Sequence, residues 1–71
     1  MQYEVTVDFD DSCGDVVTHR AFFSMLDKYA GGIGTGHSDG TSSMEVHGYF
    51  LQNLRRDLNS AGIKLLGIKK L

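Results

Sequence analysis

The side chains of this chain that could carry chemistry are one cysteine, Cys13, three histidines, His19, His37 and His47, and the carboxylate of Asp39. A thiol and an imidazole can form a nucleophilic pair, and a thiol at a helix N-terminus has a lowered pKa. That would favour Cys13 with His19 as the pair. The carboxylates around Cys13 oppose it, because nearby negative charge disfavours a thiolate. We therefore expect an inert thiol and a protein that is not an enzyme.

The same side chains fit no zinc pattern, and a single thiol cannot complete a cysteine-rich site. The segment Gly31 to Gly36, followed by His37, is similar in composition to a phosphate-binding loop. Such a loop follows a strand and opens a helix, whereas this segment is predicted to follow a helix and enter a hairpin. We expect no metal and no cofactor. A small-ligand-binding regulatory domain that uses the Gly31 to Gly36 loop remains an alternative function.

The elements that position these residues follow from hydrophobic periods that switch between two and 3.6 residues. Asp39-Gly40 separates two of the predicted strands and is a dipeptide favoured in a two-residue type I′ hairpin turn. The predicted elements are a strand over residues 2–10, a helix over Val16–Ala30, strands over residues 33–38 and Thr41–His47, a helix from Gly48 or Tyr49 to Ala61, and a strand over residues 63–71.

This βαββαβ order resembles the ferredoxin-like superfold over the whole chain of 71 residues, which we interpret as a single domain. The resemblance implies an α+β two-layer sandwich, with an antiparallel sheet in the order 4-1-3-2 and both helices on one face. It implies no activity, because a superfold hosts many functions. The inward-facing residues predicted to share the core are Val5, Val7, Phe22, Leu26, Leu54 and Leu58.

The last strand has apolar residues in both of its alternating phases. Leu65 lies in one phase, and Leu66 and Ile68 lie in the other. Two large aliphatic side chains on an open sheet face would form a patch that monomers usually limit. We therefore expect another chain to cover Leu66 and Ile68, in a homodimer or in a complex with a partner.

Charge is distributed unevenly, although the net charge is only −2. The first 15 residues contain five carboxylates and no lysine or arginine, whereas the last part of the chain is basic. One interpretation is that the two ends neutralise each other as neighbouring strands, or that the acids serve solubility. The other is an acidic surface that binds a protein partner with a basic surface. The residues predicted to form that surface are Glu4, Asp8, Asp10, Asp11 and Glu45.

The sequence thus favours a small protein-binding module, an inhibitor or adaptor. Its size and charge are similar to those of inhibitors from phages and mobile elements, such as anti-CRISPR proteins, which occupy the nucleic-acid-binding sites of host defence complexes. An RNA-binding module is a second alternative, with Arg55 and Arg56 as contacts, but acids on the open sheet face would repel phosphate. The chain has no signal-peptide pattern and no membrane-spanning run. With a single cysteine, this indicates a cytoplasmic protein.

Overall fold

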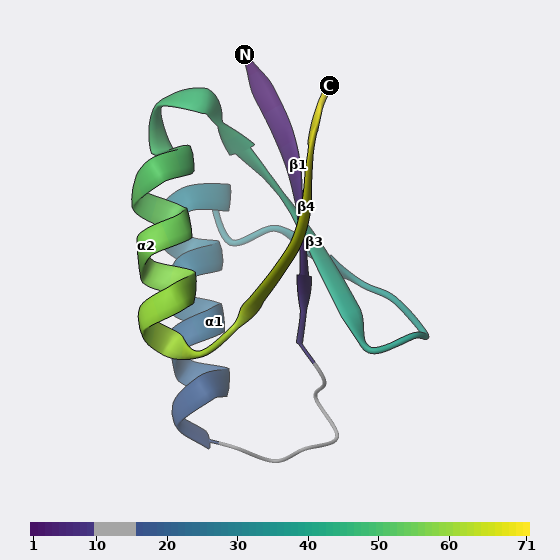
Figure 1. Ribbon diagram of the computed structural model, residues 1–71, viewed down its shortest axis with the longest axis vertical. Coiled ribbons are helices and arrows are strands. Elements are labelled where there is room, and N and C mark those ends of the chain that lie inside the picture. The colour runs from purple at the N-terminus through teal and green to yellow at the C-terminus, as the bar shows by residue number, and fades with distance from the viewer. Residues whose placement is uncertain (10–15) are drawn as a thin grey trace.

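The computed structural model describes residues 1–9 and 16–71, and both helices lie against one face of a four-stranded sheet (Figure 1). The elements are β1 (Gln2–Asp8), α1 (Val16–Ala30), β2 (Gly34–Gly36), β3 (Thr41–His47), the 3-10 turn η2 (Gly48–Phe50), α2 (Leu51–Ala61) and β4 (Lys64–Lys70). The predicted order of strands and helices is confirmed. Of the helices described, neither is long and apolar enough to cross a membrane.

The four strands form one antiparallel sheet in the order β2-β3-β1-β4. This is the predicted order 4-1-3-2 taken from the opposite edge. Strand β1 is central and pairs with β3 along its whole length, from Gln2 opposite His47 to Asp8 opposite Thr41. Its other neighbour is β4, so the acidic strand at the start of the chain lies beside the basic strand at its end.

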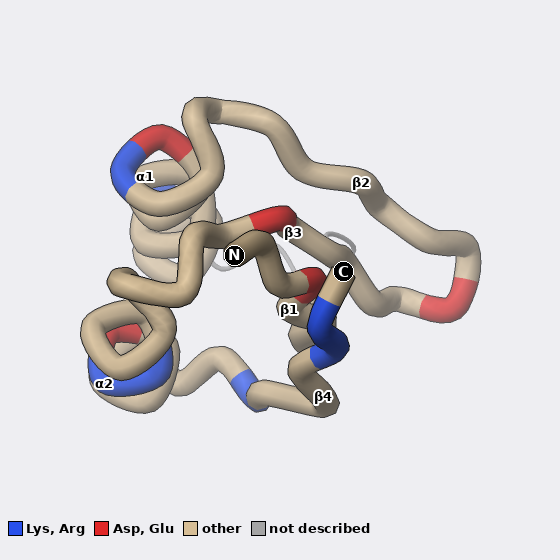
Figure 2. The backbone as a smooth tube through the Cα atoms, turned by 90° about the horizontal axis from the view of Figure 1, so that it is seen from above, with Lys and Arg blue, Asp and Glu red and all other residues tan. Residues whose placement is uncertain are grey.

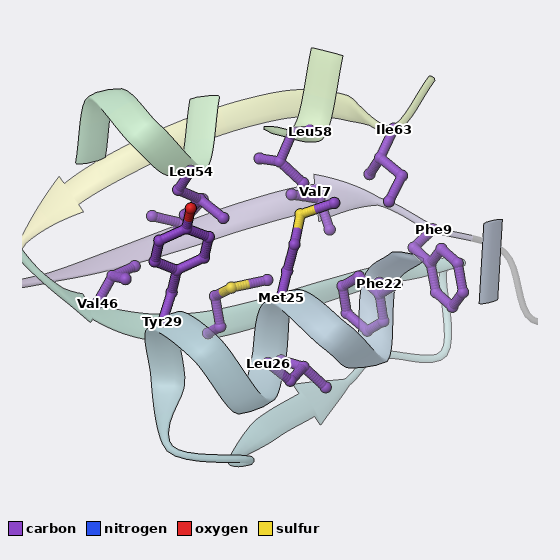
Figure 3. Close-up of a cluster of buried hydrophobic side chains, with 12 residues drawn as sticks. Val7, Phe9, Phe22, Met25, Leu26, Tyr29, Val46, Leu54, Leu58 and Ile63 are labelled. Carbon is purple, nitrogen blue, oxygen red and sulfur yellow. The ribbon is translucent and has the colours of Figure 1, made fainter. Parts of the chain in front are cut away.

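The core lies between the sheet and the two helices (Figure 3). Val5, Val7 and Leu54 are fully buried, and Tyr29 and Met25 of α1 point into the core, with Tyr29 directed toward Leu54 of α2. All six residues predicted to share the core belong to this one cluster. Helix α1 therefore uses Phe22 for the core, while its neighbour Phe23 is exposed.

A hydrogen bond joins the two helices at the edge of the core. The hydroxyl of Tyr29 on α1 donates to Oδ2 of Asp57 on α2 at 2.6 Å. This hydrogen bond lowers the pKa of Asp57, and the ammonium of Lys28, 3.8 Å from the same oxygen, lowers it further. The Asp57 carboxylate therefore stays charged and holds α1 to α2.

The turn between β2 and β3 differs from the predicted two-residue type I′ turn. That turn needs positive φ at both central residues, Asp39 and Gly40. Gly40 has φ 86°, but none of the non-glycine residues described has a positive φ. Instead, His37 N–H donates to the Thr41 carbonyl at 2.9 Å and Gly40 N–H donates to the His37 carbonyl at 3.4 Å. Residues 38–40 thus form a three-residue loop, and β2 is shorter than predicted.

A β-bulge in β4 changes which of its side chains face the core. Leu65 lies opposite Val7 and Ile68 lies opposite Val5, because the register shifts between Thr6 and Val7. Leu65 and Ile68 therefore both pack against the core, and only Leu66 is left out, 47% exposed. The prediction that Leu66 and Ile68 share an open face was wrong. That pair consequently gives no reason to expect a homodimer.

Candidate functional site

One face of the sheet is turned away from both helices, and we call it the open face (Figure 1). Residues directly paired in an antiparallel sheet project to the same side. Val5 and Met44 pair and are buried under the helices, so the alternate pair Glu4 and Glu45 projects to the open face. The acids of β1 and β3 are thus on the side that the sequence predicted.

The strands that form the open face carry charges of both signs: Figure 2 shows acidic residues on β1 and β3 and basic residues on β4. Glu4 lies directly opposite Glu45 on β3 and opposite Lys69 on β4. Asp8, at the other end of β1, lies opposite Lys64. The structure therefore brings Glu4 and Glu45 together, and it places a lysine of β4 opposite both Glu4 and Asp8. The sequence analysis had allowed for such neutralisation between the chain ends.

Two other predicted surface residues, Asp10 and Asp11, lie outside the described residues, and so does Cys13. His19, the candidate partner of Cys13, lies edge-on to the Phe9 ring with 5.1 Å between ring centroids. Within residues 1–9 and 16–71, no group of three His, Cys, Asp or Glu side chains is placed to hold a metal ion.

A groove of about 440 Å³ lies between the start of β2 and the open face of β1 and β3. Glu4 and Glu45 line it together with Gln2 and Thr35. Ile33 also lines it and is 74% exposed, so the groove combines two carboxylates with an accessible apolar side chain. Its volume is within the range of sites that hold a small molecule or a large side chain.

His37 and Ser43 also line this groove, and side-chain hydrogen bonds connect them to each other and to Thr6. Nε2 of His37 is 2.9 Å from Oγ of Ser43, which is 3.2 Å from Oγ1 of Thr6. A serine beside a histidine is one part of a nucleophilic site. Here Ser43 is only 8% exposed, and the neighbouring glutamates would disfavour a developing oxyanion. The contact therefore suits positioning of the His37 loop against β3 better than catalysis.

The hairpin loop beyond His37 is fixed by its own carboxylate. Oδ1 of Asp39 accepts hydrogen bonds from the hydroxyl of Thr41 at 2.6 Å and from its N–H at 3.1 Å. The hydroxyl hydrogen bond, followed by the backbone one, lowers the pKa of Asp39. Asp39 therefore serves the turn, and the sequence had considered it only as a metal ligand or turn residue.

An exposed aromatic pair next to the open face was missed by sequence reasoning. Tyr49 is 81% exposed, and its ring stacks on His47 with 4.0 Å between centroids. His47 lies opposite Gln2, at the end of β3. The sequence signal for this pair is the aromatic Tyr49 directly after Gly48, but the helical pattern predicts Gly48 or Tyr49 as the start of the second helix.

A second hollow, of about 650 Å³, runs along α1 and is lined by Val16, Phe23 and Asp27 among others. Within residues 1–9 and 16–71, all of its lining residues belong to this one helix. Binding sites usually converge polar groups from several elements around a ligand. The groove on the open face, which draws on β1, β2 and β3, meets that criterion better.

Comparison with known proteins leaves the groove to be interpreted from its own geometry. Neither protein-family models, nor curated proteins, nor solved structures give a match to this chain. The strongest functional feature is therefore the juxtaposition of Glu4 and Glu45 in the groove on the open face.

Proposed function

We propose that the chain is a non-enzymatic protein-binding module whose groove receives a lysine or arginine side chain from a partner with a basic surface. The observation that carries this proposal is the pairing of Glu4 directly opposite Glu45 in a groove of about 440 Å³. Like charges directly opposite on neighbouring strands destabilise a sheet. A cation bound between them would remove that cost, so the unbound arrangement favours binding.

The lining of the groove suits a side chain that is apolar along its length and charged at its end. Lysine and arginine both have this character, with an aliphatic stem and a cationic head. The exposed Ile33 would contact the stem, and the carboxylates of Glu4 and Glu45 would bind the head. An arginine head offers planar, bidentate hydrogen bonding to carboxylates, which makes it the better fit.

A basic protein surface is typical of proteins that bind nucleic acid. The carboxylates on the open face would compete with nucleic-acid phosphates for the basic surface of such a partner. This supports an inhibitor or adaptor that occupies a nucleic-acid-binding site, in the manner of anti-CRISPR proteins. Asp8, at the other end of β1, is proposed to extend the same surface; Lys64 lies opposite it as Lys69 lies opposite Glu4. Direct RNA binding is disfavoured by the two glutamates.

We also propose that the fold is ferredoxin-like. The βαββαβ order, the antiparallel sheet order and the helices on one face support that assignment. Unrelated functions share this fold, so it adds nothing to the choice of function.

A small cationic ligand is the second candidate. Ile33, Gly34 and Thr35, all within or next to β2, line the groove, and they belong to the Gly31 to Gly36 segment. A free ligand with a guanidinium group would meet the same carboxylates as a protein side chain. Titration of the protein with arginine amide separates the two candidates, because only the small-ligand function requires tight binding of the amide alone.

The test uses the protein and its Glu4→Gln/Glu45→Gln variant as matched baits for affinity capture from the source cell. Asp27→Asn, which removes an exposed carboxylate on α1, is the control. A true partner binds the parent and the control, and it loses affinity by about tenfold or more for the double variant, since each lost charged hydrogen bond costs about 1.5–3 kcal/mol. Binding should also weaken with added salt. A captured partner that binds the double variant as tightly as the parent refutes the proposal.

A further inference from the structure

The sheet has a step at the edge that borders the groove. Strand β2 pairs with β3 only at Ser42, Ser43 and Met44. Strand β3 continues through residues 45–47, and on this side no strand of the described chain lies beside them. The groove is located at this step, because both Glu45 of β3 and Ile33, the residue before β2, line it.

The direction of the backbone groups at the step follows from two backbone hydrogen bonds. The Thr41 carbonyl accepts a hydrogen bond from the His37 N–H at 2.9 Å and therefore points toward β2. Gly48 N–H donates to Met1 at 2.9 Å and therefore points toward β1. Backbone groups alternate sides along an antiparallel strand. Those of Glu45 and His47 consequently point away from β1, toward the side where β2 has ended.

The described part of the chain does not supply the missing strand. Ile33 would be the next residue of β2 opposite Glu45, but its N–H donates to the Ala30 carbonyl at 3.2 Å. The carbonyl of Glu45 and the N–H of His47 therefore have no strand partner on this side among the described residues. In a parallel ladder, one residue of the neighbouring strand bonds two such groups. Its N–H would donate to the Glu45 carbonyl, and its carbonyl would accept from the His47 N–H.

We propose that this step binds an extended segment of the protein partner, which adds beside residues 45–47 as a short strand and places a lysine or arginine at Glu4 and Glu45. The inference rests on the proposed function and adds the conformation in which the partner is recognised. Backbone hydrogen bonds would supply affinity, and the cationic side chain would supply specificity, as in other cases of strand addition.

Charge and length identify the occupant. The carboxylates of Glu4 and Glu45 select a basic segment. The stretch of β3 that β2 does not pair, residues 45–47, covers three residues, which matches a short loop or a chain terminus. Among the described strands, a second copy could offer its β2 edge, which is three residues long and has no lysine or arginine, or its β4 edge, which is seven residues long and contains a bulge. Bulges and lysines such as Lys64 and Lys70 on an edge strand oppose edge-to-edge pairing. A partner segment is therefore favoured over a second copy.

The test starts from phage-displayed eight-residue peptides with one fixed arginine, selected on the folded protein. The strongest binder is synthesised unmodified, with citrulline in place of arginine, and with N-methyl groups on its backbone amides. We expect each modification to lower affinity by about tenfold or more. In NMR titrations the amide signals of Glu45 and His47 should shift with the unmodified peptide. Glu45→Gln should weaken its binding by a similar factor, and Asp27→Asn should leave it unchanged.

The two modified peptides separate this inference from the proposed function. Unchanged binding of the N-methylated peptide overturns strand addition, whereas unchanged binding of the citrulline peptide overturns the cation site. Arginine amide that binds as tightly as the peptide overturns strand addition in favour of a small ligand. Selected peptides that leave the Glu45 and His47 signals unmoved overturn both proposals. Self-association that Glu45→Gln abolishes assigns the step to a second copy and overturns the partner segment.

Discussion

Replacing Gly34 of β2 with alanine tests how closely the short edge strand packs on α1. A Cβ atom at Gly34 would lie 2.8 Å from Cδ2 of Leu26, 3.3 Å from its Cδ1 and 3.4 Å from the Ser43 carbonyl oxygen. The first distance is too short for two carbon atoms, so Leu26 has to move. Leu26 is only 7% exposed and is held in the core, which makes that movement costly.

Gly36 provides a matched control in the same strand. It projects to the same side of the sheet as Gly34, and a Cβ atom there would have nothing within 4 Å. Neither glycine has a positive φ, so alanine is compatible with both backbones. Each substitution stabilises by about 0.4–1 kcal/mol through the unfolded chain. Only Gly34→Ala also incurs an overpacking cost, about 1–3 kcal/mol.

The entropic gain cancels between the two variants, so their free energies of unfolding should differ by about 1–3 kcal/mol. Gly36→Ala should be slightly more stable than the parent, and Gly34→Ala should be less stable than Gly36→Ala. Urea titrations followed by circular dichroism measure both. Leu26→Ala should cost less in the Gly34→Ala background, because the new methyl group fills part of the cavity. Equal stability of the two glycine variants would refute this account of the packing.

Four further substitutions test the core, the helix contact and the acidic pair. Leu54→Ala should lower the free energy of unfolding by about 2–5 kcal/mol because Leu54 is fully buried, whereas Leu66→Ala should change it by less than about 0.5 kcal/mol; similar urea midpoints would contradict the burial pattern. Tyr29→Phe removes the hydrogen bond that holds the pKa of Asp57 below 3.8. A carboxyl whose pKa is lower in the folded state stabilises the protein at pH values above its unfolded-state pKa, and that stabilisation is lost as the pH falls. The free energy of unfolding of Tyr29→Phe should therefore approach that of the parent between pH 7 and about pH 2. A difference that stays constant over this range would contradict the role of the hydrogen bond. Glu45→Gln should raise stability by about 0.2–1 kcal/mol at low salt by removing a like-charge pair, and a lowered melting temperature would contradict that repulsion.

The order of elements could be predicted from the sequence because each element has a clear hydrophobic period, but the register of β4 could not. The period of the last strand appeared to place Leu66 and Ile68 on one face. The bulge shifts the phase between Leu65 and Ile68 so that both reach the core. Register depends on pairing with β1, and the hydrophobic period of the strand alone does not encode it. A glycine inside the strand, Gly67, was the local signal, since such glycines often mark bulges.

The acidic pair of the candidate site could also be predicted, and the groove around it could not. Glu4 and Glu45 were placed on one face by alternation and strand order, both of which are sequence-level properties. The groove exists because β2 begins only at Gly34, which ends the strand on this side, and because the N–H of Ile33 before it donates to the Ala30 carbonyl of α1. That ending is a tertiary effect of the α1 C-terminus, where two consecutive glycines, Gly31 and Gly32, adopt left-handed backbone conformations. The sequence analysis had extended the strand through Ile33.

The core residues stabilise this small domain, whereas the acidic pair in the groove destabilises it, and that contrast supports a binding role. Leu54 and Val5 contribute to a single core, which in a chain of 71 residues leaves little stability in reserve. Glu4 opposite Glu45 reduces that reserve, with only Lys69 beside Glu4 on β4 to offset the repulsion. Violations of local rules that the fold does not need are concentrated at functional sites. Substitutions at Glu4 and Glu45 should therefore stabilise the protein while they abolish binding. Substitutions in the core should destabilise the protein without selectively weakening binding.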